Sequence, residues 1–507
     1  MKQTTSLLAV VALVATLFVG APVAAQVDTG SADFSRYVSM GDSLTAAIVS
    51  GGWLDTFQIN SYPALIHRQA TGGDAGFEQP LLGAPGITPP MFLANLVPPI
   101  FGALPGLGVP TNLNLPRPYN NLGIPGADAG DLLRTVTDGM GPFDLVLRGQ
   151  GTALQQALAL QPTFITIWIG SNDALGAATS GTVIDGVTLT TAASFEADYR
   201  AIVSSLAATG AGLMIANLPE VTAIPFVTTL APVVINPATN QPVTDPAGNL
   251  IPLLGPNGPL ALNDHVLLTA GGLLAQGFGI PTFLGGNGQP LPGQVILDAA
   301  ETATITNRIA AFNSIIQTVA NEVGAAFYDL NRSFRQLGAE GTVVGGIDYG
   351  FDFLTGGLFS YDGVHASPFG YAFVANEMIE VINDSFGAEI PRVGLGPYVF
   401  GPNQLDPRGA LGQAVRAVSQ VKIKGEVWDN LRFLGMNIPA IQTTSTTTPG
   451  GGGGDVGEQG NGNDTAEDGD QSDGGDQPQG NANDDDDTPD IEDELPEDRW
   501  EIDPIFE

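Results

Sequence analysis

The chain has 507 residues, which is enough for one large domain or two ordinary ones with a sizeable buried core. It contains no cysteine, which excludes disulfide bonds, thiolate metal sites and cysteine nucleophiles. Its 17 lysines and arginines stand against 53 aspartates and glutamates, and the resulting net charge of −36 repels phosphate backbones. We therefore expect no nucleic-acid partner.

The N-terminus has the pattern of a secretory signal peptide. Lys2 precedes an apolar run over residues 7–19, and small residues follow up to Ala25. This order predicts a signal peptide over residues 1–25 that is cleaved near Ala25. The run is short for a membrane-spanning helix, and an uncleaved anchor is the alternative. We expect an exported protein, in the periplasm, at the cell surface or secreted, with no membrane span after cleavage.

Residues 37–45, with the sequence YVSMGDSLT, predict a strand followed by a helix. The apolar start reads as a buried parallel strand, which breaks at Gly41-Asp42-Ser43 before the helix-compatible residues 44–49. Ser43 would then lie at the carboxyl end of a strand, beside a helix N-terminus whose N–H groups point outward. Ser43 is a candidate nucleophile and oxyanion donor. Alternatively, Asp42 and Ser43 only cap the helix.

Further strands and helices alternate along the chain, which predicts a parallel sheet with helices on both faces, a doubly wound α/β domain. Apolar and β-branched runs predict the other strands at residues 119–122, 164–169, 212–218 and 325–330. Helical patterns cover residues 62–70, 127–136, 143–160, 194–208, 296–323 and 368–385. Ser367 and Pro368 form a suitable N-terminus for the last helix. We place the catalytic domain within residues 26–386.

Two long segments rich in proline, glycine and aliphatic residues interrupt this alternation, at about residues 79–118 and 219–292. Proline at this density prevents regular ladders, and the apolar content is too high for a solvated linker. We interpret both as ordered insertions, with one helix over residues 260–275 in the second. The first could be a satellite core under a long loop or have a substrate-binding role, and both could wall an apolar pocket.

The C-terminal region changes character twice. Residues 387–442 hold several of the scarce cations and one or two short helices, and we interpret them as an appendage without an assigned function. Residues 443–507 are of low complexity, and residues 455–507 alone contain 21 acidic residues and one arginine. Such a segment buries too little apolar surface to fold, which predicts a disordered tail. Its aromatic end, residues 500–506, could instead be a docking peptide.

The sequence contains three histidines, so candidate general bases are few. His67 lies within a predicted helix, where we expect it to pack or cap locally, and His265 lies in a polar junction that we expect on the surface. His365 follows Asp362 by three residues, just before the last helix. Asp362 could orient this imidazole while its other nitrogen takes the Ser43 proton. The alternative is an Asx turn beside an incidental histidine.

Oxyanion donors are expected at other strand ends. Asn172 follows an apolar strand through a glycine, and Gly126 offers a backbone N–H that no side chain shields. Together with the Ser43 N–H they would converge where charge develops on a substrate carbonyl. Alternatively, Asn172 is a helix N-cap and Gly126 a simple turn glycine.

Four sequence blocks in order resemble those of the GDSL, or SGNH, hydrolase family: Gly41-Asp42-Ser43-Leu44, Gly126 in a Pro-Gly-Ala-Asp turn, Gly170-Ser171-Asn172-Asp173, and Asp362-Gly363-Val364-His365. The resemblance covers residues 34–386 apart from the insertions. It implies a three-layer α/β/α sandwich, a triad of Ser43, Asp362 and His365, and an oxyanion hole of Ser43, Gly126 and Asn172. Ala366 stands where many members have proline, which alters the loop rather than the chemistry.

These residues predict acyl transfer to Ser43 and then to water, with no metal or organic cofactor. The apolar insertions favour a lipase or carboxylesterase acting on acyl or lipid esters, as a monomer. A carbohydrate esterase that removes acetyl groups is the nearest alternative. A non-catalytic exported surface or binding protein on a hydrolase scaffold is the alternative from another class.

Overall fold

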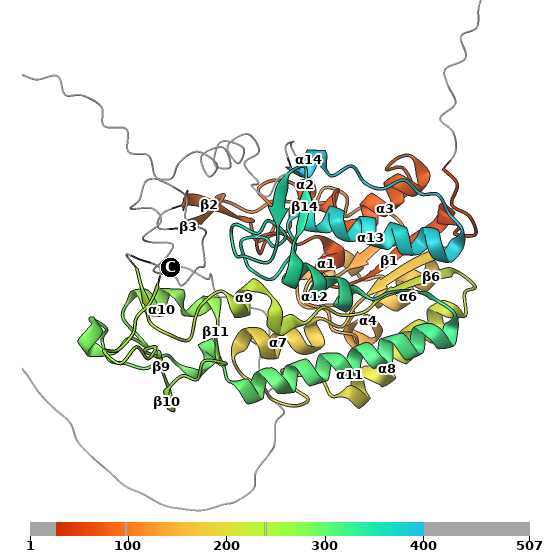
Figure 1. Ribbon diagram of the computed structural model, residues 1–507. Helices are drawn as coiled ribbons and strands as arrows, with labels where there is room; N and C mark the ends of the chain where they lie inside the picture. Colours follow the sequence, from red (N-terminus) through yellow and green to blue (C-terminus); the bar gives the residue numbers. More distant parts are fainter. Residues whose placement is uncertain (1–26, 97–98, 238, 240, 400–507) are drawn as a thin grey trace, which may run out of the picture. The chain divides into compact units, whose positions relative to one another are not determined.

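The computed structural model of the chain describes residues 27–399 except residues 97, 98, 238 and 240 (Figure 1). The predicted signal peptide, residues 400–442 of the appendage and the acidic tail lie outside the described residues. Within them, no helix is long and apolar enough to cross a membrane.

A central sheet of five parallel strands organises the fold, in the order β13-β6-β5-β1-β4. The strands are β1 (Tyr37–Gly41), β4 (Asn121–Gly123), β5 (Phe164–Trp168), β6 (Gly212–Ala216) and β13 (Ala326–Tyr328). All five predicted strands are present, and every residue of β1 and β5 is buried, as expected for a sheet covered on both faces. Gly41 pairs with Gly123 on one side and with Trp168 on the other. The carboxyl ends of β4, β1 and β5 therefore lie side by side.

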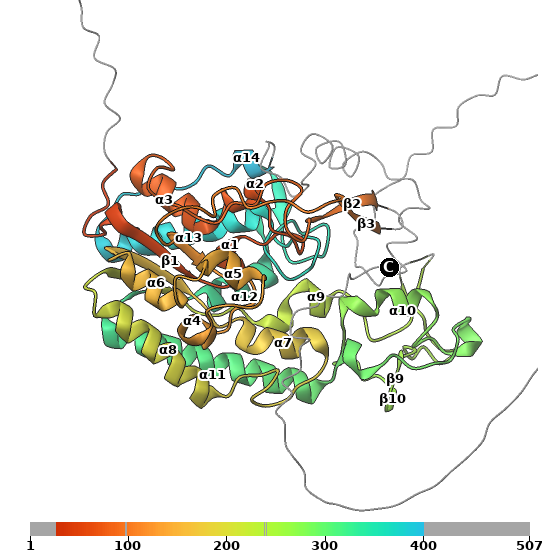
Figure 2. The same cartoon turned by 180° about the vertical axis from the view of Figure 1, so that it is seen from behind.

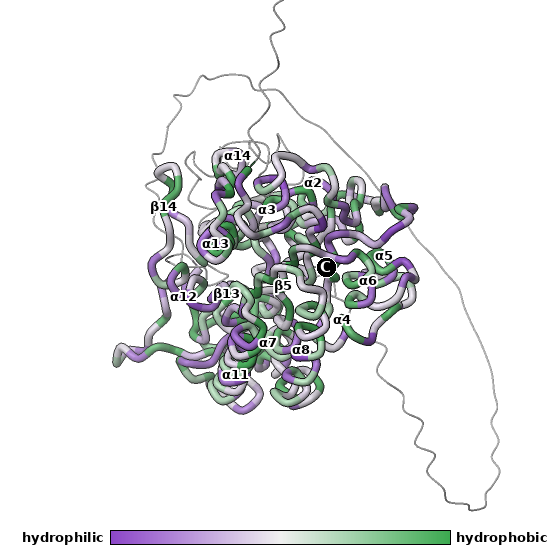
Figure 3. Tube along the Cα trace, turned by 90° about the vertical axis from the view of Figure 1, so that its right-hand side faces the viewer, coloured by the Kyte–Doolittle hydropathy of each residue, from purple (hydrophilic) through white to green (hydrophobic). Residues whose placement is uncertain are grey.

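Helices cover both faces of this sheet. Helices α3 (Tyr62–Thr71) and α13 (Pro368–Phe386) lie on one face, and α8 (Ala192–Ala207) and α11 (Ala299–Val323) lie on the other (Figures 1 and 2). Hydrophobic segments surround β5 and β13 between these layers (Figure 3). The observed architecture confirms the predicted three-layer α/β/α fold.

Three predicted helices are shorter than expected because the chain leaves the helical conformation early. The helix predicted at residues 44–49 is α1 (Ser43–Ala46), which ends because Ala47 is left-handed with φ 60°. The helix predicted at residues 143–160 is split into α5 (Pro142–Leu147) and α6 (Ala153–Ala159), since Arg148 and two glycines turn the chain between them. Only α4 (Asp131–Arg134) forms within residues 127–136.

The expectation that proline prevents regular strand pairing in the first insertion is wrong. It contains an antiparallel hairpin of β2 (Met91–Leu96) and β3 (Pro99–Ala103). The prolines stand before β2 and at the start of β3, so the interiors of both strands keep their N–H groups for pairing. The prediction used the proline content of the whole segment. It therefore overlooked that residues 91–96 and 100–103 contain no proline.

The second insertion has a small hydrophobic core of its own, which includes Leu230, Val266, Leu274 and Leu291. The predicted helix over residues 260–275 is wrong, because β11 (His265–Val266) and a short 3-10 turn precede α10 (Gly271–Ala275). The other strands of the insertion are β7 (Ile235–Asn236), β8 (Gln241–Pro242), β9 (Leu254–Gly255) and β10 (Gly258–Pro259). Strand β12 (Ile296–Leu297) follows the insertion and pairs with β11.

The remaining elements connect or extend the sheet domain: α2 (Asp55–Gln58), α7 (Asn172–Ser180), α9 (Pro225–Thr228), α12 (Leu330–Glu340), β14 (Thr342–Val344), β15 (Ile347–Tyr349) and α14 (Gly396–Val399). The sequence did not predict α7, α12 or the β14–β15 hairpin. Ser367 caps α13 by accepting from the Gly370 N–H, with Pro368 in the first turn, as predicted. Beyond α13, Ile390 and Tyr398 pack into the main core.

Candidate active site

Ser43 is the first residue of α1 and follows β1 directly. The preceding residue, Asp42, is the N-cap, and its carboxylate accepts from the Leu44 N–H at 2.9 Å. A Cβ at Gly41 would clash with Thr45 Oγ1 and the Trp168 carbonyl oxygen, so only glycine fits this turn. Burial raises the pKa of Asp42 to about 6, against the opposing effects of the Leu44 N–H and His365. The capping role belongs to Asp42, which leaves the Ser43 hydroxyl available.

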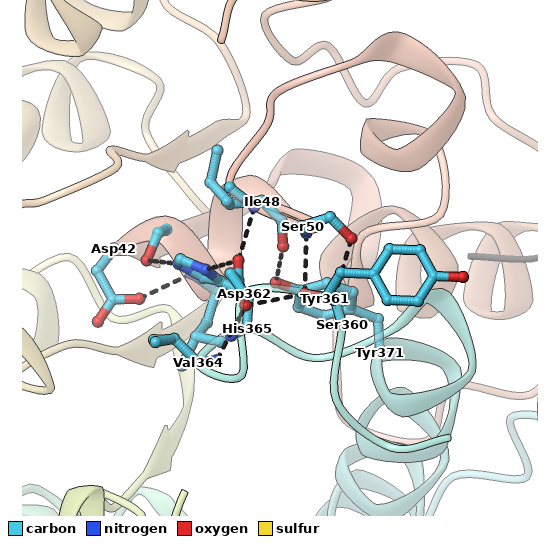
Figure 4. A network of polar contacts seen from close by, with 12 residues as sticks. Asp42, Ile48, Ser50, Ser360, Tyr361, Asp362, Val364, His365 and Tyr371 are labelled. Atoms are coloured by element: carbon cyan, nitrogen blue, oxygen red, sulfur yellow. Dashed lines mark hydrogen bonds and ion pairs between the residues drawn. The ribbon is translucent and has the colours of Figure 1, made fainter. Parts of the chain in front are cut away.

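Ser43, His365 and Asp362 form a continuous line of hydrogen bonds. Figure 4 shows His365 and Asp362 of this line. His365 Nε2 lies 2.9 Å from Ser43 Oγ, and His365 Nδ1 lies 2.8 Å from Asp362 Oδ2. The serine and the histidine are 322 positions apart in the sequence. The fold thus brings the three predicted side chains into contact in the order that proton transfer requires.

Asp362 is buried and accepts five hydrogen bonds. Its Oδ2 accepts from His365 Nδ1 and from the Gly51 N–H at 2.7 Å. Its Oδ1 accepts from the Ser360 hydroxyl and from the N–H groups of Val364 and His365. Burial by itself would raise the pKa of Asp362, but the facing imidazole and these donors lower it below the ordinary value. Asp362 is therefore a carboxylate at neutral pH.

Two of these donors were missed by sequence reasoning. Gly51 lies 311 positions from Asp362, and no local pattern connects them. Ser360 lies only two positions away, but nothing in the sequence distinguishes it from other loop serines.

The other two histidines lie apart from this line of hydrogen bonds. His67 is buried in α3, and its ring stacks against those of Tyr37 and Phe77, which confirms the packing role. His265 lies in β11 and pairs with Leu297, where burial lowers its pKa. It is half-buried rather than on the surface as predicted, because the insertion folds into its own small core around it.

The predicted oxyanion donors lie at the three adjacent strand ends. Gly126 follows β4 with φ 84°, in the left-handed region that favours glycine, and Asn172 follows β5 as the first residue of α7. The N-cap of that helix is Ser171, so the capping alternative for Asn172 is wrong. The Asn172 side-chain amide donates to the Ala127 carbonyl oxygen at 2.9 Å, which holds it over the turn that carries Gly126. Within the part of the chain that the structure describes, the N–H groups of Ser43 and Gly126 donate to no protein acceptor.

Asp173 is a further buried group that sequence reasoning did not use. Its Oδ2 accepts from the Ala129 N–H at 2.9 Å, so Asn172 and Asp173 together hold the turn after β4. Burial raises the pKa of Asp173 to about 8, and the nearby Asp128 adds to the shift. Its place beside Asn172 in the Gly-Ser-Asn-Asp block was the available signal.

We expect an Asp173→Asn variant to be more stable than the wild type at about pH 8, by several degrees in Tm, with the difference shrinking towards pH 4. The folded protein retains a proton up to about pH 8 that an unfolded aspartate loses near 3.8, so stability falls as pH rises between these values. Asparagine does not ionise and still accepts from the Ala129 N–H. Thermal unfolding of both proteins across this pH range measures the effect, and a difference independent of pH would show that Asp173 is ionised in the folded state.

Comparison with known proteins identifies the family to which the chain belongs. The chain matches the family model of the GDSL-like lipases and acylhydrolases over residues 37–378. No curated protein matches it. Among the described residues, no cluster of three or more His, Cys, Asp or Glu side chains could hold a metal ion.

Similar solved structures share little sequence with the chain. One is a catalytic mutant of an acetylxylan esterase from Geobacillus stearothermophilus, with 12% identity, a TM-score of 0.32, and coverage of 72% of this chain and 99% of that chain. Another is the lipase/acylhydrolase from Enterococcus faecalis, with 14% identity, a TM-score of 0.29, and coverage of 70% and 98%. TM-scores this low support no conclusion about substrate. The family match spans more than half of the 507 residues, so the chain belongs to the GDSL-like lipase/acylhydrolase family and is an ester hydrolase.

Proposed function

We propose that the chain hydrolyses carboxylic acyl esters with Ser43 as nucleophile, His365 as general base and Asp362 as the residue that orients the base. The hydrogen-bonded line from Ser43 Oγ through His365 to Asp362 is the observation that carries this proposal. Because Asp362 is a carboxylate, it accepts from an Nδ1–H, and Nε2 is left as the acceptor that faces the hydroxyl.

The proposed reaction has two steps. Ser43 Oγ attacks the carbonyl carbon while His365 Nε2 takes its proton, and the carbonyl oxygen becomes an oxyanion. The N–H groups of Ser43 and Gly126 and the Asn172 amide stabilise that charge. The imidazolium next donates its proton to the departing alkoxide, which leaves an acyl-serine. Water, activated by the same imidazole, attacks the acyl-serine and releases the acid and Ser43.

Both insertions contact the loop around Asp362, and the apolar side chains Phe101 and Leu268 that they bring there favour an acyl chain as the substrate group. In the first insertion, the Phe101 ring lies 5.8 Å from that of Tyr361. In the second, the Phe226 N–H donates to the Gly363 carbonyl oxygen at 2.9 Å, and Leu268 packs beside the same glycine. The β2–β3 hairpin and α10 also lie at the same end of the domain in both views (Figures 1 and 2). We propose a lipase or carboxylesterase on this basis.

A chain-length series of p-nitrophenyl esters tests the proposal. We expect kcat/KM to rise from acetate to medium-chain esters by about fourfold per buried methylene, which corresponds to about 0.8 kcal/mol for each CH₂. A strict preference for acetate would reject the acyl pocket and favour the carbohydrate esterase.

The Ser43→Ala variant is the control. It should hydrolyse none of these esters and should not react with a fluorophosphonate probe that labels the wild type. Equal labelling of the two would reject the serine-hydrolase mechanism and favour a non-catalytic protein.

A further inference from the structure

The chain that follows the nucleophile folds back to reach Asp362. After α1, residues 47–52, which we call the return turn, adopt left-handed conformations at Ala47, Ser50 and Gly51, with φ values of 60°, 54° and 70°. Tyr371 from α13 supports the turn by donating to the Ile48 carbonyl oxygen at 2.7 Å. These conformations aim the consecutive N–H groups of Ser50 and Gly51 at the loop that carries Asp362. Figure 4 shows Ser50 beside Ser360 and Tyr361 of that loop.

The return turn reaches each carboxylate oxygen of Asp362 by a different route. The Gly51 N–H donates directly to Oδ2 at 2.7 Å. The Ser50 N–H donates to the Ser360 hydroxyl at 2.8 Å, and that hydroxyl donates to Oδ1 at 3.0 Å. A reciprocal bond joins the same segments, because the Tyr361 N–H donates to Ser50 Oγ at 3.2 Å. Ser50 and Ser360 are 0% and 1% exposed, so no solvent substitutes for these bonds.

The Ser360 hydroxyl has one proton, and its surroundings decide where that proton points. Because the Ser50 N–H occupies a lone pair of the oxygen, the O–H is directed at Asp362 Oδ1. This bond adds to those from the N–H groups of Val364 and His365 in holding Oδ1, and Oδ2 is left to face His365 Nδ1. Residues 43–51 therefore begin with the nucleophile Ser43 and end with the Ser50 and Gly51 N–H groups that hold Asp362, one through Ser360 and one directly.

We propose that Ser360 is a positioning residue. It links the return turn to Asp362 and so fixes the position of the orienting carboxylate relative to the nucleophile. The inference rests on the proposed function, since it assigns a role in orienting His365 towards Ser43. The Ser360 hydroxyl is buried, and it bonds to the Ser50 N–H and Asp362 rather than to Ser43 or the His365 ring. Its effect on turnover therefore passes through Asp362 alone.

Three substitutions at position 360 that differ in hydrogen-bonding ability test the proposal through their kcat and KM values. Ser360→Ala should lower kcat for a p-nitrophenyl ester by about 10- to 100-fold, as for loss of a hydrogen bond to a charged group, with KM within about twofold. Ser360→Thr keeps the hydroxyl and should retain kcat within about threefold. Ser360→Cys, whose thiol is a weaker donor, should fall between them. The matched control is Ser61→Ala, which removes another buried hydroxyl that caps α3 and donates to Gln79. It should lower Tm without lowering kcat.

A double-mutant cycle shows whether the effect passes through Asp362. On an Asp362→Asn background, Ser360→Ala should lower kcat by less than about twofold further. A further tenfold loss on that background, or an unchanged kcat for a folded Ser360→Ala, would overturn the inference. So would a raised KM with unchanged kcat. Fluorophosphonate labelling separates this outcome from failure of the proposed function: labelling that is lost in Ser43→Ala supports the mechanism whatever position 360 shows, and labelling that persists rejects the mechanism itself.

Discussion

An Asp362→Asn variant is expected to lose about 10⁴-fold in kcat while it remains folded. The Asp362 carboxylate is the acceptor in all five of its hydrogen bonds. The Val364 N–H donates to Oδ1 and the Gly51 N–H donates to Oδ2. Whichever way an asparagine side chain turns, its NH₂ group therefore meets a backbone N–H. At the Oδ1 position the NH₂ group would meet the N–H groups of both Val364 and His365. At the Oδ2 position it meets only that of Gly51 and can donate to His365 Nδ1, so this orientation is favoured. Nε2 then carries the proton and cannot take one from Ser43.

The measurement is kcat on a p-nitrophenyl ester together with thermal unfolding of the same sample. Asp384→Asn is the matched control, because it makes the same change in charge at an exposed position of α13 and should leave kcat unchanged. A loss smaller than about tenfold in a folded Asp362→Asn protein would mean that other contacts orient His365.

The strands and the residues that follow them could be predicted because their signals are local. Gly41, Gly126 and Asn172 each follow an apolar run, and parallel strands bring their carboxyl ends to one edge whatever the connections between them. The sequence could therefore place the residues of the candidate site at three strand ends and one loop, and the structure brings them close together. Contacts that depend on tertiary packing left no such signal. Gly51 reaches Asp362 only because the return turn folds back, and the sequence around it reads as an unremarkable turn.

The helix ends that were missed have a common physical cause. Ala47 and Arg148 adopt left-handed conformations although neither is glycine, so residue preferences place both inside helices. Hydrogen bonds formed after folding compensate for these conformations. Arg148, for example, donates to the carbonyl oxygens of Leu115 and Arg117 in the first insertion, and its guanidinium lies over the Tyr119 ring. Residue propensity contains no information about such partners.

An Asn172→Ala variant is expected to lose about 10²–10³-fold in kcat, which corresponds to about 3–4 kcal/mol of transition-state stabilisation, with little change in KM. The Asn172 amide nitrogen has two hydrogens. One is used on the Ala127 carbonyl oxygen, which fixes the plane of the amide, and the other remains for an oxyanion. Because the charge on the carbonyl oxygen develops only as Ser43 attacks, the lost donor lowers kcat rather than substrate binding.

The control for this variant must separate the loss of the donor from the loss of the structural bond to Ala127. Asn383 in α13 offers the same kind of contact, since its amide donates to the Ile390 carbonyl oxygen at 2.9 Å away from the three strand ends. Asn383→Ala should lower Tm at least as much as Asn172→Ala and leave kcat within about twofold. Binding of an arylboronate that mimics the tetrahedral intermediate should weaken in parallel with kcat in Asn172→Ala only. If KM rises while kcat and boronate binding stay unchanged, Asn172 shapes the substrate site, and the oxyanion is held by the N–H groups of Ser43 and Gly126 alone.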